Sequence, residues 1–178
     1  MRVVTTYLAW TTTVLSAVTA QVANVTIIPA ATGFKDETTA FVYGSSPILI
    51  ANDKGAADGG FRTFAISNGS SFKELSHLKT GRSVTVVPVH NIGGRDLIVN
   101  VPAPDSLIRV FDAETGKPVD NNDKIQLGFW DTACVWRSST SGESYMFLFG
   151  KKAVVQFLIR GTSKDVEVVE VNTHFDVA

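Results

Sequence analysis

A repeated pattern of short apolar segments, with a period of about 47 residues, constrains this chain most strongly. Phe64, Phe111 and Phe157 lie 47 and 46 residues apart. Each follows one of three corresponding apolar segments: Ile48-Leu49-Ile50, Leu97-Ile98-Val99 and Met146-Phe147-Leu148. Further β-forming segments precede these, at Thr39–Tyr43, Val84–Val89 and Thr132–Trp136. Units of four strands that recur every 40–50 residues or so are typical of β-propeller blades. The chain is therefore predicted to be all-β, and a β-sandwich with accidental spacing is the alternative.

The stretch from Gly128 to Ile159 shows one unit most clearly. Its strands are predicted at Thr132–Arg137, Tyr145–Phe149 and Val154–Ile159, and polar or glycine-containing turns separate them. Residues 21–178 hold about three blades of four antiparallel strands, whereas closed propellers use about 4–8 blades. We therefore expect the propeller to be incomplete, and to be joined by a further propeller domain or completed by self-association.

Composition excludes some classes of partner. Hydrophobic residues make up 44% of the chain and charged residues 19%, and the formal net charge is −1. These values are typical of a globular protein with a real core. Because basic residues are not in excess, the chain is not expected to bind nucleic acid or an anionic membrane surface.

The amino-terminal residues resemble a secretory signal. Residues 1–20 combine Arg2, a mostly apolar segment and the small residue Ala20 before a predicted cut at Gln21. A membrane anchor is the alternative reading. Asn24 and Asn68 begin glycosylation sequons, Asn24-Val25-Thr26 and Asn68-Gly69-Ser70, which suit a secreted, extracellular protein. The single cysteine, Cys134, is predicted to be a buried, inert thiol, and Trp130 and Trp136 are predicted to lie in the core between blades.

Three segments together resemble the amino-terminal part of the β-propeller phytase family, in particular secreted 3-phytase-like proteins of the fungal type. The first is ILIANDKGAADGGFRTFAI, with Asp53, Lys54, Gly59 and Gly60 on the family pattern. The second is LIVNVPAPDSLIRVFDAETGK. The third is CVWRSSTSGESYMFLFGKKAVVQFLI, where the matching positions include Cys134, Trp136, Arg137, Ser138, Gly142, Tyr145, Gly150, Lys151, Gln156 and Phe157. The resemblance spans residues 39–171.

This resemblance implies a six-bladed propeller that hydrolyses phytate (inositol hexakisphosphate) with Ca²⁺. Oxygen ligands would hold the metal, and metal ions would offset the phosphate charge. By position, Lys54 and Lys151 correspond to phosphate-binding lysines, and Arg82 lies near the position of a phosphate-binding arginine. Asp36, Glu37 and Asp53 are the carboxylates that the resemblance offers as calcium ligands.

The chain also departs from the family pattern. Thr85 stands at an acidic position, Val87 at the arginine position, and Asp131 at a tyrosine position. These departures favour a second hypothesis, in which the chain is a non-catalytic propeller module that binds phytate or a partner and assists an active domain. A non-functional interpretation of the candidate site residues is also possible, because Asp36 and Glu37 fit an exposed acidic loop and Lys151 fits a solvated turn. The oxygen-rich segment Asp120–Asp123 is predicted to be a solvated loop, because it lacks the spacing of an EF-hand.

Overall fold

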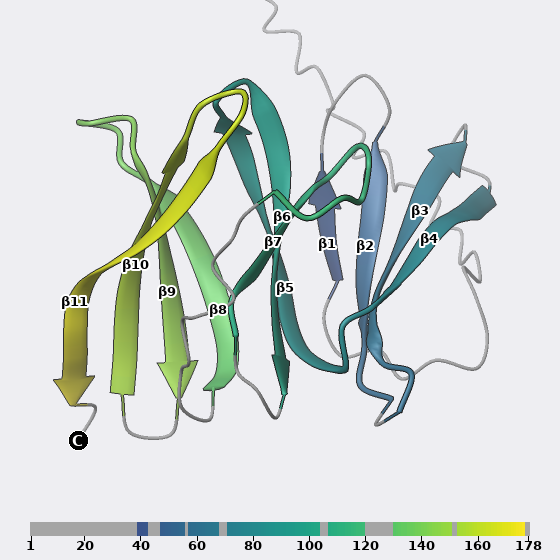
Figure 1. Cartoon of the computed structure of the whole chain (residues 1–178), viewed down its shortest axis with the longest axis horizontal. Helices are drawn as coiled ribbons and strands as arrows, with labels where there is room; N and C mark the ends of the chain where they lie inside the picture. Colours follow the sequence, from purple (N-terminus) through teal and green to yellow (C-terminus); the bar gives the residue numbers. More distant parts are fainter. Residues whose placement is uncertain are drawn as a thin grey trace, which may run out of the picture.

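The computed structural model describes residues 39–42, 47–55, 57–67, 71–103, 107–119, 130–150 and 153–176. These residues form eleven β-strands and no helix, arranged as three antiparallel sheets side by side (Figure 1). The first sheet contains β1 (Thr39–Val42), β2 (Ile48–Asp53), β3 (Gly60–Ser67) and β4 (Ser71–Lys79). The second contains β5 (Arg82–Ile92), β6 (Arg95–Ala103) and β7 (Arg109–Asp112). The third contains β8 (Trp130–Arg137), β9 (Ser144–Gly150), β10 (Ala153–Gly161) and β11 (Val166–Asp176). The prediction of an all-β, antiparallel chain is confirmed for this part.

Each sheet is a simple meander, in which every strand pairs with the next one along the chain. Tight turns make this possible. Gly93 and Gly94 connect β5 to β6 with φ values of 58° and 83°, as a two-residue hairpin turn with two positive φ angles requires. A Cβ atom added to Gly93 would lie 2.3 Å from the backbone of Thr162, in the turn between β10 and β11. The hairpins of the second and third sheets therefore touch, and Arg95 donates a hydrogen bond to the Thr162 carbonyl, at 3.3 Å.

Two apolar cores join the three sheets. The first and second sheets meet in the smaller core, which contains Ile48, Ile50, Phe61, Val86, Ile98, Phe111 and Ala113. The second and third sheets meet in the larger core, which includes Val87, Val89, Leu97, Val99, Val110, Met146, Leu148, Val155, Phe157 and Ile159. Neighbouring positions of β5 and β6 contribute to different cores because side chains of a strand alternate between faces. The second sheet is thus buried on both sides. The first strands of the sheets also lie next to one another, since β5 contacts both β1 and β8.

The repeat predicted from the sequence corresponds to equivalent places in the three sheets. Phe64, Phe111 and Phe157 all lie on the third strand of their sheet, and their exposed fractions are 0%, 6% and 0%. Their partners on the second strand are Leu49, Ile98 and Met146. The sequence alignment placed Phe147 in the last of these positions, which is wrong by one residue. Phe147 pairs with Gln156 and with Cys134, on the opposite face of the third sheet.

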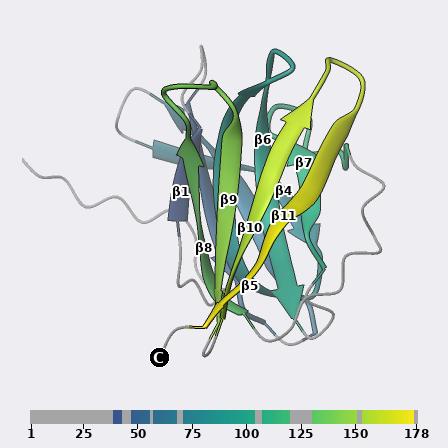
Figure 2. The same cartoon turned by 90° about the vertical axis from the view of Figure 1, so that its left-hand side faces the viewer.

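That face of the third sheet points away from the second sheet, and Figure 2 views it directly. It carries Trp136, which is 53% exposed and stacks on Tyr145 with ring centroids 5.9 Å apart. Cys134, on the same face, is also exposed. The predictions that Cys134 and Trp136 are buried are therefore wrong, because β8 buries its alternate residues against the second sheet instead. Trp130 does pack against the larger core, as predicted.

Several sequence predictions concern residues outside the described ranges. These are the signal at residues 1–20, both glycosylation asparagines, Asn24 and Asn68, the acidic pair Asp36 and Glu37, the loop at residues 120–123, and Lys151. They stay predictions. Within the described ranges, the structure contains no helix with the length and apolar character needed to cross a membrane.

Candidate functional site at the Lys54 end

Two of the predicted phosphate-binding residues lie at the same end of neighbouring sheets. Lys54 directly follows β2, and Arg82 is the first residue of β5. In Figure 1, β2 ends and β5 begins at the lower edge of the array. We call this region the Lys54 end. The side-chain amide of Asn52 fixes the relation between the two strands, because it donates to the carbonyls of Ser83 and Val84 at 3.3 and 3.4 Å. The fold therefore brings the residues next to Lys54 and those next to Arg82 together, although Lys54 and Arg82 are 28 positions apart in the sequence.

The two cations differ in their surroundings. Arg82 is exposed, whereas Lys54 is half-buried. A third cation, Lys79, ends β4 at the same end and forms an ion pair with Asp58 at 2.7 Å. The hydrogen bond from Lys79, reinforced by its charge, lowers the pKa of the exposed Asp58 carboxyl below its ordinary value. Such an end can attract a phosphorylated ligand through cations from both the first and the second sheet.

Asp53, the predicted metal ligand of β2, is already engaged within the protein. Its side chain is 8% exposed, and its Oδ1 accepts a hydrogen bond from the Gly55 backbone amide at 2.9 Å. Its Oδ2 lies 3.7 Å from Nε of Arg62 on β3. Arg62 also binds Glu74 of β4, with Nη1 at 3.2 and 3.0 Å from the two carboxylate oxygens. Asp53 thus anchors the loop after β2. It also belongs to an ion-pair network across the first sheet, in which the Arg62 guanidinium lies between the carboxylates of Asp53 and Glu74.

The geometry of this loop explains the glycine at position 59. A Cβ atom on Gly59 would lie 2.2 Å from the Gly55 carbonyl oxygen and 2.6 Å from that of Asp53. Only glycine permits the backbone to come so close. The match of Gly59 to the family pattern therefore has a local physical reason, namely the compact loop that carries Lys54.

Calcium requires about 6–8 oxygen ligands. Of the three predicted ligands only Asp53 lies in the described part, and its carboxylate is shared with Arg62. Within the described ranges, no group of three or more histidine, cysteine or acidic side chains is placed to hold a metal ion. The described residues alone do not fit a calcium ion, and no catalytic step through calcium follows from them. A calcium site would depend on Asp36 and Glu37.

A buried polar network lies behind the Lys54 end, and the sequence prediction missed it. Asn100, fully buried on β6, donates to the Ser83 hydroxyl at 2.6 Å and to the Thr85 carbonyl at 3.3 Å. It also accepts a hydrogen bond from the Thr80 hydroxyl at 2.8 Å. The available signal was an asparagine within the otherwise apolar segment Leu97–Val101. Buried amides require partners, so this network fixes the link between the first and second sheets.

The two departures from the family pattern on β5 are also buried. Thr85 is 2% exposed, and Val87 is 9% exposed within the larger core. Neither can supply charge to a ligand. The cationic side chains of the Lys54 end come from strand ends and not from the middle of β5.

No known family model, no curated protein and no solved structure matches this chain.

Proposed function

We propose that this chain belongs to a secreted β-propeller of the phytase type and that its Lys54 end binds the phosphate groups of phytate or a related phosphorylated small molecule. The observation that carries this proposal is the link between Asn52 and the start of β5, because it holds Lys54 and Arg82 at one end of two sheets. Phytate carries many phosphate groups on a small ring, and several cations from different elements suit such a ligand.

The leading form of the proposal is a calcium-dependent phosphomonoesterase that acts on phytate. It adds Lys151 as a third phosphate ligand, and Asp36, Glu37 and Asp53 as calcium ligands. Bound calcium would neutralise phosphate charge. In the sequence, Lys151 directly follows Gly150, the last residue of β9, as Lys54 directly follows β2, and this parallel supports the enzyme form.

A propeller arrangement is supported by the equivalence of the three sheets. Phe64, Phe111 and Phe157 occupy the same strand position, and the last two face the preceding sheet. The third sheet presents an apolar face in the direction in which a next blade would pack. We propose that a further propeller domain or a second copy of the chain covers this face.

A second candidate is a non-catalytic module that binds phytate and assists an active domain. Two observations favour it. Thr85 and Val87 are buried where the family has charged residues, and Asp53 is engaged by Arg62 and by the Gly55 amide. This candidate retains the cations of the Lys54 end and omits hydrolysis.

One set of experiments separates the two candidates. The full chain is incubated with phytate, with and without Ca²⁺, and phosphate release is measured beside binding by calorimetry. Lys54→Ala and Lys151→Ala test the site, and Lys164→Ala, in the exposed turn between β10 and β11, is the matched control. Circular dichroism verifies that each variant is folded.

The outcomes are distinct. Calcium-dependent release that the Lys54 and Lys151 variants reduce supports the enzyme. Binding without release, weakened about tenfold by Lys54→Ala and unchanged by Lys164→Ala, supports the non-catalytic module. Neither binding nor release by the folded chain refutes both candidates. Secretion is tested separately, by expression in a eukaryotic host and by the mass shift that a glycosidase causes in the wild type but not in an Asn24→Gln, Asn68→Gln variant.

A further inference from the structure

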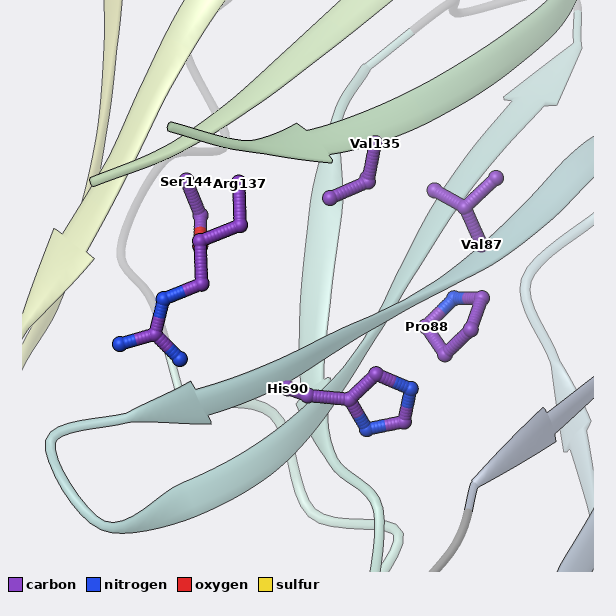
Figure 3. A pocket seen from close by; sticks show the side chains of 6 residues that line it. All are labelled: Val87, Pro88, His90, Val135, Arg137 and Ser144. Atoms are coloured by element: carbon purple, nitrogen blue, oxygen red, sulfur yellow. The ribbon is translucent and has the colours of Figure 1, made fainter. Parts of the chain in front are cut away.

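A pocket lies between the second and third sheets, at the end opposite Lys54. It has a volume of about 390 Å³ and is lined by Val87, Pro88, His90, Val135, Arg137 and Ser144 (Figure 3). β5 starts at Arg82 and reaches His90 near its far end, while β8 ends at Arg137. The pocket therefore opens where these two strands finish. We call it the β5–β8 pocket.

Its polar side chains are Arg137, His90 and Ser144. Arg137 donates from Nε to the Gly142 carbonyl at 2.9 Å, which orients the guanidinium while leaving its terminal nitrogens available to a ligand. His90 lies with Nδ1 3.5 Å from Oδ1 of Asp96, so its Nε2 edge is not used by that contact. Asp96 does not line the pocket, and its Oδ1 is also bound by the Asn91 amide at 2.9 Å. The lining thus combines an arginine and a histidine with no carboxylate.

The remaining wall is mostly apolar. Figure 3 shows Arg137 and Ser144 on one side of the pocket and Val87 and Pro88 on the other. Val135 of β8 completes the apolar lining and packs against the larger core. A heavily hydrated polyanion such as phytate would gain little from this wall. A molecule with one anionic group and an apolar body would satisfy both parts.

We infer that the β5–β8 pocket binds a small amphipathic anion. Arg137 holds the anionic head group through charge-assisted hydrogen bonds, His90 adds a second donor when protonated, and the apolar body lies against Val87, Pro88 and Val135. This site is independent of the phosphate-binding residues at the Lys54 end, since it shares none of them.

The test uses the full chain and defined probes. The two anionic probes are 4-phenylbutyrate, which has a carboxylate head group, and phenyl phosphate, which has a phosphate head group. Their binding is measured by calorimetry and by saturation-transfer NMR. Acetate supplies the head group alone, and 4-phenyl-1-butanol supplies the body alone. Arg137→Gln removes the cation. Arg160→Gln, an exposed arginine of β10 paired with Glu167, is the matched control.

We expect one of the two anionic probes to bind at least about tenfold more tightly than acetate or 4-phenyl-1-butanol, because neither fragment satisfies both parts of the pocket. Arg137→Gln should weaken this binding about tenfold or more, and Arg160→Gln should leave it unchanged. Arg137→Gln also removes the hydrogen bond to the Gly142 carbonyl in the turn before Glu143, so a second variant is needed. His90→Glu is this variant, because His90 is exposed and the added negative charge should weaken binding by a similar factor. Equal binding of the anionic probe and the alcohol, or unchanged binding in both folded variants, would overturn the inference.

Discussion

At the scale of single residues, the polar side chains inside this protein are more informative than the exposed ones. Asn52 and Asn100 occupy apolar strands and are fully buried, yet both make hydrogen bonds that join separate elements. The family resemblance predicted Lys54 as a site residue by its position in the family pattern. The sequence could not predict these amide contacts, because each depends on backbone groups that only the packed sheets bring near. The burial of Cys134 and Trp136 was mispredicted for a related reason, since alternation in a strand does not say which face has a neighbour.

Asn100→Ala should destabilise the protein by about 2–4 kcal/mol, since it leaves the buried Ser83 hydroxyl and Thr85 carbonyl without their amide partner. Denaturant unfolding measures the change. Asn91→Gly is the control, because Asn91 is exposed with a φ of 56° that glycine adopts readily, and it should cost almost nothing. A loss below about 1 kcal/mol for Asn100→Ala would mean that water replaces the amide.

Lys79→Ala should raise the pKa of Asp58 toward its ordinary value, because the ammonium hydrogen bond that lowers it is removed. A carboxyl whose pKa is depressed by folding contributes stability above its unfolded pKa, and this contribution is lost as the pH falls through the folded pKa. Carboxyl ¹³C NMR titration measures the shift directly. An Asp58 titration that is identical in the wild type and the variant would show that the pair does not persist in solution.

At the scale of elements, the strands follow the apolar segments closely, and the errors have local causes. The β-forming segment predicted at Val84–Val89 is shorter than β5, partly because Asn91–Arg95 has the composition of a turn. The strand continues to Ile92 because Asn91 takes a positive φ and the ladder is irregular between Val89 and Ile92. Only the two central glycines form the turn. A bulge of this kind adds a residue that no period-2 pattern can locate.

The β5–β6 turn allows a matched comparison of two glycines. Gly93→Ala and Gly94→Ala both place a side chain at positive φ, which costs about 1–2 kcal/mol. Gly93→Ala should cost about 1–3 kcal/mol more, since its Cβ meets the Thr162 backbone, whereas nothing lies within 4 Å of a Cβ at Gly94. Thermal and denaturant unfolding of both variants measure the difference. Equal destabilisation would argue that the two hairpins separate easily in solution.

At the scale of the whole molecule, the repeat period predicted three equivalent units, and the structure arranges them as three consecutive sheets. The order of the sheets along the chain follows from that equivalence. The partner of the open face of the third sheet does not follow from it, because an exposed Trp136 stacked on a half-buried Tyr145 is compatible with several apolar neighbours. At the Lys54 end, the sequence likewise predicts which cations are present, but it does not predict that Asp53 pairs with Arg62.

If a second copy covers the open face, the chain should self-associate in a concentration-dependent way, and Trp136→Gln should weaken the association about tenfold or more. Leu75→Gln is the control, because Leu75 is similarly exposed, at 51%, but lies on β4 of the first sheet. Sedimentation velocity measures both, with a reductant present because Cys134 is exposed. A wild-type chain that stays monomeric at every concentration would leave a further propeller domain as the partner.

The meander order of each sheet has a consequence for how the chain folds and for how the number of its repeats can change in evolution. Since hydrogen-bonded neighbours are consecutive in the chain, the ladders of one described sheet form without any strand from another. Contacts of short sequence separation close quickly, so each sheet can act as a cooperative folding unit that docks on its neighbour afterwards. A gene segment that encodes one unit of about 47 residues could then be duplicated or lost without breaking any backbone ladder, which is how arrays of different lengths arise from one repeat.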